Sequence, residues 1–165
     1  MAKYGETIRA LPPAEVELTG DRITAGWQDL LLLVGRVATG AIFVNSGFGK
    51  LMEISSFTGR MEGMGVPVAS VMAPLGAAIE FFGGFAIILG AWTWLAALLV
   101  AAFTVAATYI AHLFWNYPPE QQAAQQTQFM KNLAIFGGLL ALVAAGPGRI
   151  SIDGLRWRRE NARYL

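Results

Sequence analysis

LLLLVGRVATGAIFVNSGFG, the stretch from Leu30 to Gly49, contains one charged side chain, Arg36. The stretch is long enough to cross a bilayer as a helix, which requires about 20 mostly apolar residues. A charged group inside such a span is costly and usually faces protein or water rather than lipid. The stretch therefore predicts a membrane-spanning helix whose arginine needs a partner.

A second apolar run contains the candidate partner. From Gly63 to Pro119 the only formally charged side chain is Glu80. Counted from the expected membrane edge at about 1.5 Å per residue, Arg36 lies about 10 Å deep and Glu80 about 15 Å deep. This difference is within the reach of an arginine side chain, so we predict that Arg36 and Glu80 form a buried ion pair. Such a pair can staple two spans together, hydrogen-bond a ligand or relay a proton.

The composition supports a membrane protein and excludes several other classes. Of the 165 residues, 55% are apolar and 14% are charged, against about 25% charged in a typical soluble domain. The net charge of +1 gives no overall basic field for nucleic acid, so we predict no nucleic-acid partner. The chain has no cysteine, which excludes disulfides and thiolate metal sites. A redox role would therefore depend on a bound cofactor, a quinone or a partner subunit.

Hydropathy predicts four spans, at about residues 29–48, 71–90, 94–114 and 129–145. Only residues 91–93 separate the second span from the third, which makes these two spans antiparallel neighbours. We therefore predict an all-α fold, an antiparallel bundle of four transmembrane helices. Residues 1–28 form a polar N-terminal arm, residues 29–148 the membrane domain and residues 149–165 an arginine-rich tail.

Helical spacing predicts which faces of the first two spans pack together. One face of the first span carries Arg36, Thr39, Gly40, Phe43 and Gly47. One face of the second span carries Gly76, Glu80, Gly83, Gly84 and Ile87. Small residues around a lone acid let another helix approach closely. Outside the spans, we expect a short amphipathic helix around residues 57–64 and a helical start at residues 121–128 that continues into the fourth span.

Basic residues predict the orientation. Five arginines follow the fourth span and three basic residues lie in the N-terminal arm, whereas the loop after the first span carries Lys50 and Arg60 and the loop from Trp115 to Met130 carries none. Short segments rich in Lys and Arg stay on the cytoplasmic side. With an even number of spans, we expect both termini to be cytoplasmic.

Polar side chains from three spans are expected at similar depth near the outer edge: Asn45, His112, Lys131 and Asn132. If they converge, they line a polar pocket with Glu80 as its floor, and the surrounding aromatic residues suit a planar apolar ligand such as a quinone. The alternatives are that His112 is a hydrogen-bonded helix-end residue and that Lys131 snorkels to the interface. The spans offer too few His and carboxylate side chains for zinc or di-iron, so we predict no metal site.

Five motifs together resemble the DoxX family of small four-helix membrane proteins of bacteria and archaea. They are GRVATGAIFVNSGFGKL (35–51), AAIEFFGGFAIILG (77–90), HLFWN (112–116), QFMKNLAIFGGLL (128–140) and GPGRISID (146–153). Relatives in that family include a membrane subunit of thiosulfate:quinone oxidoreductase. The resemblance implies a multi-pass protein of the bacterial inner membrane that works with a quinone and with other membrane or peripheral redox subunits. If the protein is enzymatic, it is then an oxidoreductase subunit.

Two other functions remain open on the sequence alone. A non-catalytic accessory subunit could stabilise a larger respiratory or photosynthetic complex. A small-solute or proton carrier would use the same buried polar residues.

Overall fold

The computed structural model describes residues 18–161, with side chains placed from residue 26 to residue 159. This part of the chain contains α-helices and one 3-10 helix, and no β-strand. The elements are α1 (Leu18–Met52), α2 (Ile54–Gly63), α3 (Ala69–Leu89), α4 (Thr93–Ala111), η1 (Phe114–Asn116), α5 (Pro119–Ala145) and α6 (Ile152–Asn161). The predicted all-α class is confirmed.

Four helices are long and apolar enough to cross a membrane, at Gly26–Met52, Ala69–Leu89, Thr93–Asn116 and Pro119–Ala145. The helix of the first span begins at Leu18, before the expected start at residue 29, and continues through Lys50 to Met52. Residues 1–17 of the expected arm lie outside the described residues. Both short helical features are confirmed, because α2 covers the expected amphipathic segment and α5 begins at Pro119.

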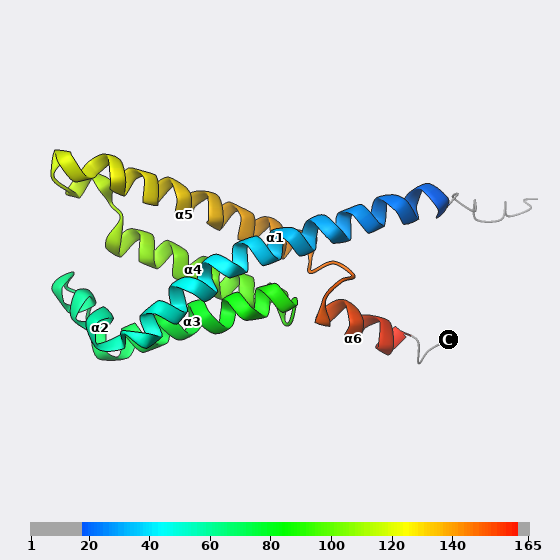
Figure 1. The fold of residues 1–165 in the computed structure, drawn as a ribbon, viewed down its shortest axis with the longest axis horizontal. Helices are drawn as coiled ribbons and strands as arrows, with labels where there is room; N and C mark the ends of the chain where they lie inside the picture. The colour runs from blue at the N-terminus through cyan, green and yellow to red at the C-terminus, as the bar shows by residue number, and fades with distance from the viewer. Residues whose placement is uncertain (1–17, 162–165) are drawn as a thin grey trace, which may run out of the picture.

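Figure 1 shows that the bundle has two different ends. At the end that we call the loop end, α2 and η1 connect the spans. At the opposite end, the tail end, a tight turn joins α3 to α4, and α6 lies beside this turn. The turn places Gly90 and Trp92 at positive φ, 65° and 43°. This confirms the expected short connection between antiparallel neighbours.

Glycines set the register between α1 and α3. A Cβ on Gly47 would lie 2.5 Å from the backbone nitrogen of Phe81, and a Cβ on Gly84 would lie 2.8 Å from the carbonyl oxygen of Gly40. Only glycine allows the two backbones to approach this closely. Of the face predicted for the first span, Arg36, Gly40, Phe43 and Gly47 are buried, which confirms that this face packs against protein.

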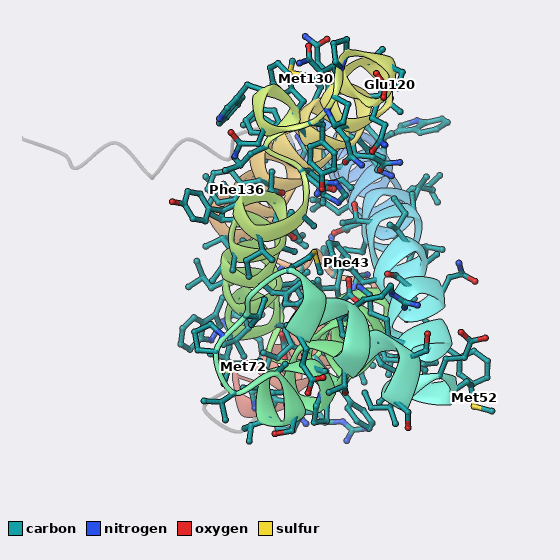
Figure 2. The ribbon with its side chains drawn as sticks, turned by 90° about the vertical axis from the view of Figure 1, so that its left-hand side faces the viewer. Phe43, Met52, Met72, Glu120, Met130 and Phe136 are labelled. Carbon is teal, nitrogen blue, oxygen red and sulfur yellow. The ribbon has the colours of Figure 1, made fainter. Side chains whose placement is uncertain are left out.

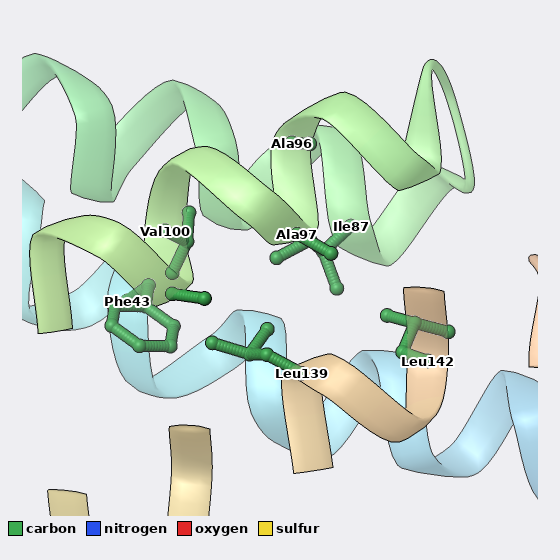
Figure 3. Close-up of a cluster of buried hydrophobic side chains, with 8 residues drawn as sticks. Phe43, Ile87, Ala96, Ala97, Val100, Leu139 and Leu142 are labelled. Carbon is green, nitrogen blue, oxygen red and sulfur yellow. The ribbon is translucent and has the colours of Figure 1, made fainter. Parts of the chain in front are cut away.

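The apolar core joins α1, α3, α4 and α5 (Figure 3). Its buried members are Phe43, Ile87, Ala96, Ala97, Val100, Ala101, Leu139 and Leu142. The alanines of α4 leave room for larger side chains from α1, α3 and α5. Most of the outward surface of the four long helices is apolar, as expected where lipid rather than water surrounds the bundle.

Candidate functional site

Glu80 of α3 is bound by two side chains of α1. Lys50 Nζ lies 2.5 Å from Glu80 Oε2, and Ser46 Oγ lies 3.3 Å from Glu80 Oε1. Glu80 is 5% exposed, and the Lys50 side chain is 23% exposed. Ser46 and Lys50 are one helical turn apart on α1, so both face the same level of α3. A buried carboxylate is thus paired with a cation and held by a hydroxyl donor.

The predicted ion pair between Arg36 and Glu80 is wrong. Arg36 Nη1 donates to the carbonyl oxygen of Ile88 at 3.4 Å, and Nη2 donates to that of Ile150. The α1–α3 register explains the error. Gly47 packs against Ala77 and Phe81, at the level of Glu80, whereas Arg36 lies beside Gly90, at the end of α3. The sequence-based depths assumed that residue 29 of α1 lies level with the end of α3. In the structure Arg36 is the residue of α1 that lies level with the α3–α4 turn.

At the tail end Arg36 helps to hold the segment after α5 against the α3–α4 turn. Arg36 is 1% exposed, and a Cβ on Gly90 would overlap both Arg36 and Ser151. Asp29 is also buried there and accepts a hydrogen bond from the backbone nitrogen of Arg149 at 2.6 Å. Arg36 therefore closes one end of the bundle.

Asp153 caps the start of α4 at the same end. Its carboxylate accepts hydrogen bonds from the backbone nitrogens of Trp92, at 3.0 Å, and Thr93, at 2.9 Å, and from Thr93 Oγ1 at 2.9 Å. Partial burial by itself raises the pKa of Asp153, but these donors, together with the charge of Arg156, outweigh it and lower the pKa below its ordinary value. The carboxylate thus stays ionised and fixed on the turn.

A cavity of about 620 Å³ lies at the loop end between α2, α3 and α4. This volume is within the range of small-molecule sites, about 300–1,000 Å³. Its walls are mostly apolar and include Met61 of α2, Met72 of α3 and Phe103 of α4. The polar side chains that line it are Lys50, Arg60 and His112.

Lys50 brings a positive charge to this apolar cavity. Its ammonium lies 5.2 Å from the ring centroid of Phe57 and 5.5 Å from that of Phe103. An ammonium has three N–H donors, and one of them binds Glu80. The remaining donors can serve an oxygen acceptor in the cavity, and the two rings can contact a flat ligand.

His112 is the one residue of the predicted outer pocket that lines this cavity. It follows the last residue of α4, and its Nδ1 lies 2.8 Å from Gln125 Oε1 of α5. An amide oxygen only accepts, so Nδ1–H donates and Nε2 is the acceptor in the neutral ring. His112 therefore combines the expected helix-end hydrogen bond with a place at the rim of the cavity.

The other predicted residues do not converge on the cavity. Asn132 donates to Thr108 Oγ1 at 2.9 Å beside a separate apolar pocket of about 230 Å³, and Asn45 and Lys131 are exposed. Figure 2, viewed from the loop end, places Met130, next to Lys131 in the chain, far from Met72 in the cavity wall. The expected single pocket is therefore wrong, because α5 packs on α4 and not beside α2.

Lys50 is the cavity-lining residue that the sequence analysis missed, because the first span was expected to end at residue 48. Two glycines, Gly40 and Gly47, provided the signal, since they mark the face of α1 that meets the glycines of α3. One helical turn beyond Gly47, the same face of α1 carries Lys50. In residues 18–161 no three His, Cys, Asp or Glu side chains are grouped as a metal site would require.

Comparison with known proteins places the chain in a family. A family model described as DoxX matches residues 31–113. The inner membrane protein YqjF of Escherichia coli is 38% identical over 128 residues, which cover 78% of this chain and 93% of YqjF. The inner membrane protein YphA of the same species is 32% identical over 126 residues, which cover 76% of this chain and 90% of YphA.

A third relative is the membrane protein Rv3486 of Mycobacterium tuberculosis, 29% identical over 133 residues, which cover 77% of this chain and 82% of Rv3486. No solved structure matches the chain. The family match lies within the four-span bundle and contains Ser46, Lys50, Glu80 and His112. The chain therefore belongs to the DoxX family of membrane proteins.

Proposed function

We propose that this protein is a membrane subunit of a quinone-linked redox system and that it holds a quinone in the loop-end cavity. The observation that carries the proposal is the ion pair between the buried Glu80 and the half-buried Lys50, which lines an apolar cavity. A quinone has the matching chemistry, a flat ring with carbonyl acceptors and a long apolar tail. When bound, it would supply the capacity to accept two electrons and two protons.

The cavity offers a separate set of side chains for the carbonyl, the ring and the tail of a quinone. Lys50 would donate a hydrogen bond to a ring carbonyl, and Glu80 would keep the ammonium in place. Phe57 and Phe103, already near Lys50, would contact the ring. The apolar side chains of α3 and α4 that line the cavity, among them Leu75 and Leu99, would take the start of the tail.

The electron donor in this proposal is a separate redox subunit. The chain contains no cysteine, so it has no thiol-disulfide couple of its own. The protein would then anchor its partner at the membrane and present the quinone to it. Membrane lipids contact the remaining apolar surface.

The proposal is tested by following the melting temperature of the purified protein as a short-chain quinone analogue is added. A ligand that binds only the folded state stabilises it by RT ln(1 + [L]/Kd), so the melting temperature should rise with concentration. An alcohol with the same apolar tail but no quinone ring is the control. It shows how much the tail alone stabilises the protein, and it should raise the melting temperature less than the quinone does.

The informative variant is Lys50→Met/Glu80→Gln, because it removes the donor without leaving a buried charge unpaired. It should lose most of the quinone shift, whereas Lys131→Met, which removes an exposed ammonium that does not line the cavity, should keep it. If the quinone gives no shift in the wild type, or if the double variant keeps the full shift, the quinone site is wrong. The protein would then be better described as an accessory subunit of a larger membrane complex.

A further inference from the structure

We infer that the tail end binds anionic phospholipid headgroups through a fixed arginine surface, formed by Arg149, Arg156, Arg158 and Arg159. This inference concerns the end of the bundle opposite the quinone cavity and does not depend on it. It rests on three observations: how α6 is fixed to the bundle, how its arginines are exposed, and where they lie relative to the ends of the spans.

Helix α6 is held rigidly against the α3–α4 turn. The backbone nitrogen of Asp153 donates to the carbonyl oxygen of Gly90 at 2.9 Å, and the Asp153 carboxylate accepts the three hydrogen bonds from Trp92 and Thr93. Ser151, buried in the connection, accepts a hydrogen bond from the backbone nitrogen of Gly154 at 2.9 Å. The arginines are therefore carried by a docked helix with a defined position.

The arginine surface keeps most of its charge available. The side chains of Arg149 and Arg156 are 64% and 49% exposed, and Arg158 and Arg159 are also exposed. The carboxylates near them are Asp29, 3.9 Å from Arg149, and Asp153, 3.8 Å from Arg156, and both are already hydrogen-bonded by backbone nitrogens. Among the described side chains, cations therefore outnumber anions on this surface.

The arginine surface lies at the level where the spans end. The α3–α4 turn marks a membrane boundary, and Trp92 and Trp94 at this turn are exposed, as is Trp157 of α6. Exposed tryptophan side chains near the ends of membrane-spanning helices are typical of the headgroup level of a bilayer. The Arg156 guanidinium lies 4.6 Å from the Trp92 ring centroid, which fixes one arginine directly beside such an indole.

Lipid phosphate is the partner that fits this arrangement. A guanidinium presents a planar set of donors that matches phosphate oxygens, and clusters of basic residues next to a span bind anionic lipid surfaces. Exposed Leu155 and Ile150, on the same segment, can contact the upper part of the acyl chains. A free phosphate ion would use the arginines but not these apolar side chains.

The test compares the melting temperature of the full-length protein in detergent micelles doped with phosphatidylglycerol or with phosphatidylcholine of the same acyl chains. Phosphatidylglycerol should raise the melting temperature of the wild type more than phosphatidylcholine does. The difference should shrink as salt is raised, because the Debye length falls from about 10 Å at 0.1 M to about 3 Å at 1 M. Inorganic phosphate at the same concentration should not reproduce the shift.

The matched variants are Arg159→Gln, which should reduce the phosphatidylglycerol shift, and Lys131→Gln on α5, which should not. Arg158→Gln/Arg159→Gln should reduce the shift further, and native mass spectrometry should find fewer phosphatidylglycerol molecules bound to it. The inference is overturned if the wild type responds equally to the two lipids, or if the arginine variants keep the full shift and the full number of bound lipids. A response to inorganic phosphate as large as that to the lipid would likewise overturn it.

Discussion

Lys50 of α1 and Glu80 of α3 form a buried ion pair, with Lys50 Nζ 2.5 Å from Glu80 Oε2. The pair lies between the α1–α3 interface, whose glycines fix its position, and the cavity under α2, whose apolar walls surround the ammonium. It therefore joins the packing of the bundle to the proposed ligand site, and changes to it should affect both.

Single changes to this pair should be more harmful than the double change. Lys50→Met or Glu80→Gln leaves one buried polar partner unmatched, and breaking a buried pair typically costs about 3–5 kcal/mol of unfolding free energy. Lys50→Met/Glu80→Gln should therefore lose less unfolding free energy than either single variant. The measurement is a double-mutant cycle on unfolding in detergent and denaturant.

The control cycle uses Arg36→Met with Glu80→Gln. These positions share no hydrogen bond or salt bridge in the described structure, so their effects should add. Strong coupling in the control cycle would restore the Arg36–Glu80 pair that the sequence alone suggested, and additivity in the Lys50 cycle would contradict the Lys50–Glu80 pair.

Gly47→Ala should destabilise the bundle, because the added Cβ would lie 2.5 Å from the Phe81 backbone nitrogen. Overpacking of this kind typically costs about 1–3 kcal/mol. Gly137→Ala on α5 is the matched control, since its Cβ meets no atom within 4 Å. Thermal melting should separate the two variants clearly, and equal melting temperatures would mean that α1 and α3 do not approach each other at Gly47.

Asp153 should make the tail end sensitive to acid. Its pKa is lowered in the folded protein, so its contribution to stability is complete above the ordinary Asp pKa of about 3.9 and is lost as the pH falls through the lower folded value. Asp153→Asn should lower the melting temperature at neutral pH and flatten the further loss on acidification. Glu62→Gln, at an exposed position of α2, is the control; a wild type and an Asp153→Asn variant with parallel acid profiles would argue against this cap.

Much of the fold could be predicted from the sequence, because a helix that crosses a bilayer needs a long run of apolar residues. Long apolar runs give the spans, Gly146 ends α5 at a φ of 78°, and the buried faces of α1 and α3 follow from helical spacing. The partner of Glu80 could not be predicted in the same way. Counting depth from the ends of spans needs the true ends, and α1 extends beyond its apolar core in both directions.

The predicted pocket failed for a related reason. Equal depth brings residues to the same level of a bundle but does not say which helices are neighbours. Asn132 bonds Thr108 across the α4–α5 contact, while Lys50 reaches Phe103 from the other side of α4. Depth placed His112 correctly at the loop end, but the sequence did not show that α2, α3 and α4 line one cavity there.

Both termini are predicted to lie in the cytoplasm, since the arginines after α5 oppose transfer across the membrane. Reporter domains fused after Leu165 and, in a separate protein, ahead of Met1 should both give cytoplasmic signals. A reporter inserted at Gln126, in the exposed first part of α5, should give the opposite signal. Any other combination would mean that the orientation or the number of crossings is different.

Photo-crosslinking with an azido-quinone tests the central proposal most directly, because it reports both binding and place. Labelled peptides from the membrane-embedded protein should contain cavity residues such as Met61, Met72 or Phe103. Excess unlabelled quinone should suppress this labelling, and Lys50→Met/Glu80→Gln should greatly reduce it. Labelling that resists competition, or that falls mainly on α5 around Lys131 and Asn132, would contradict a quinone site at the Lys50–Glu80 pair.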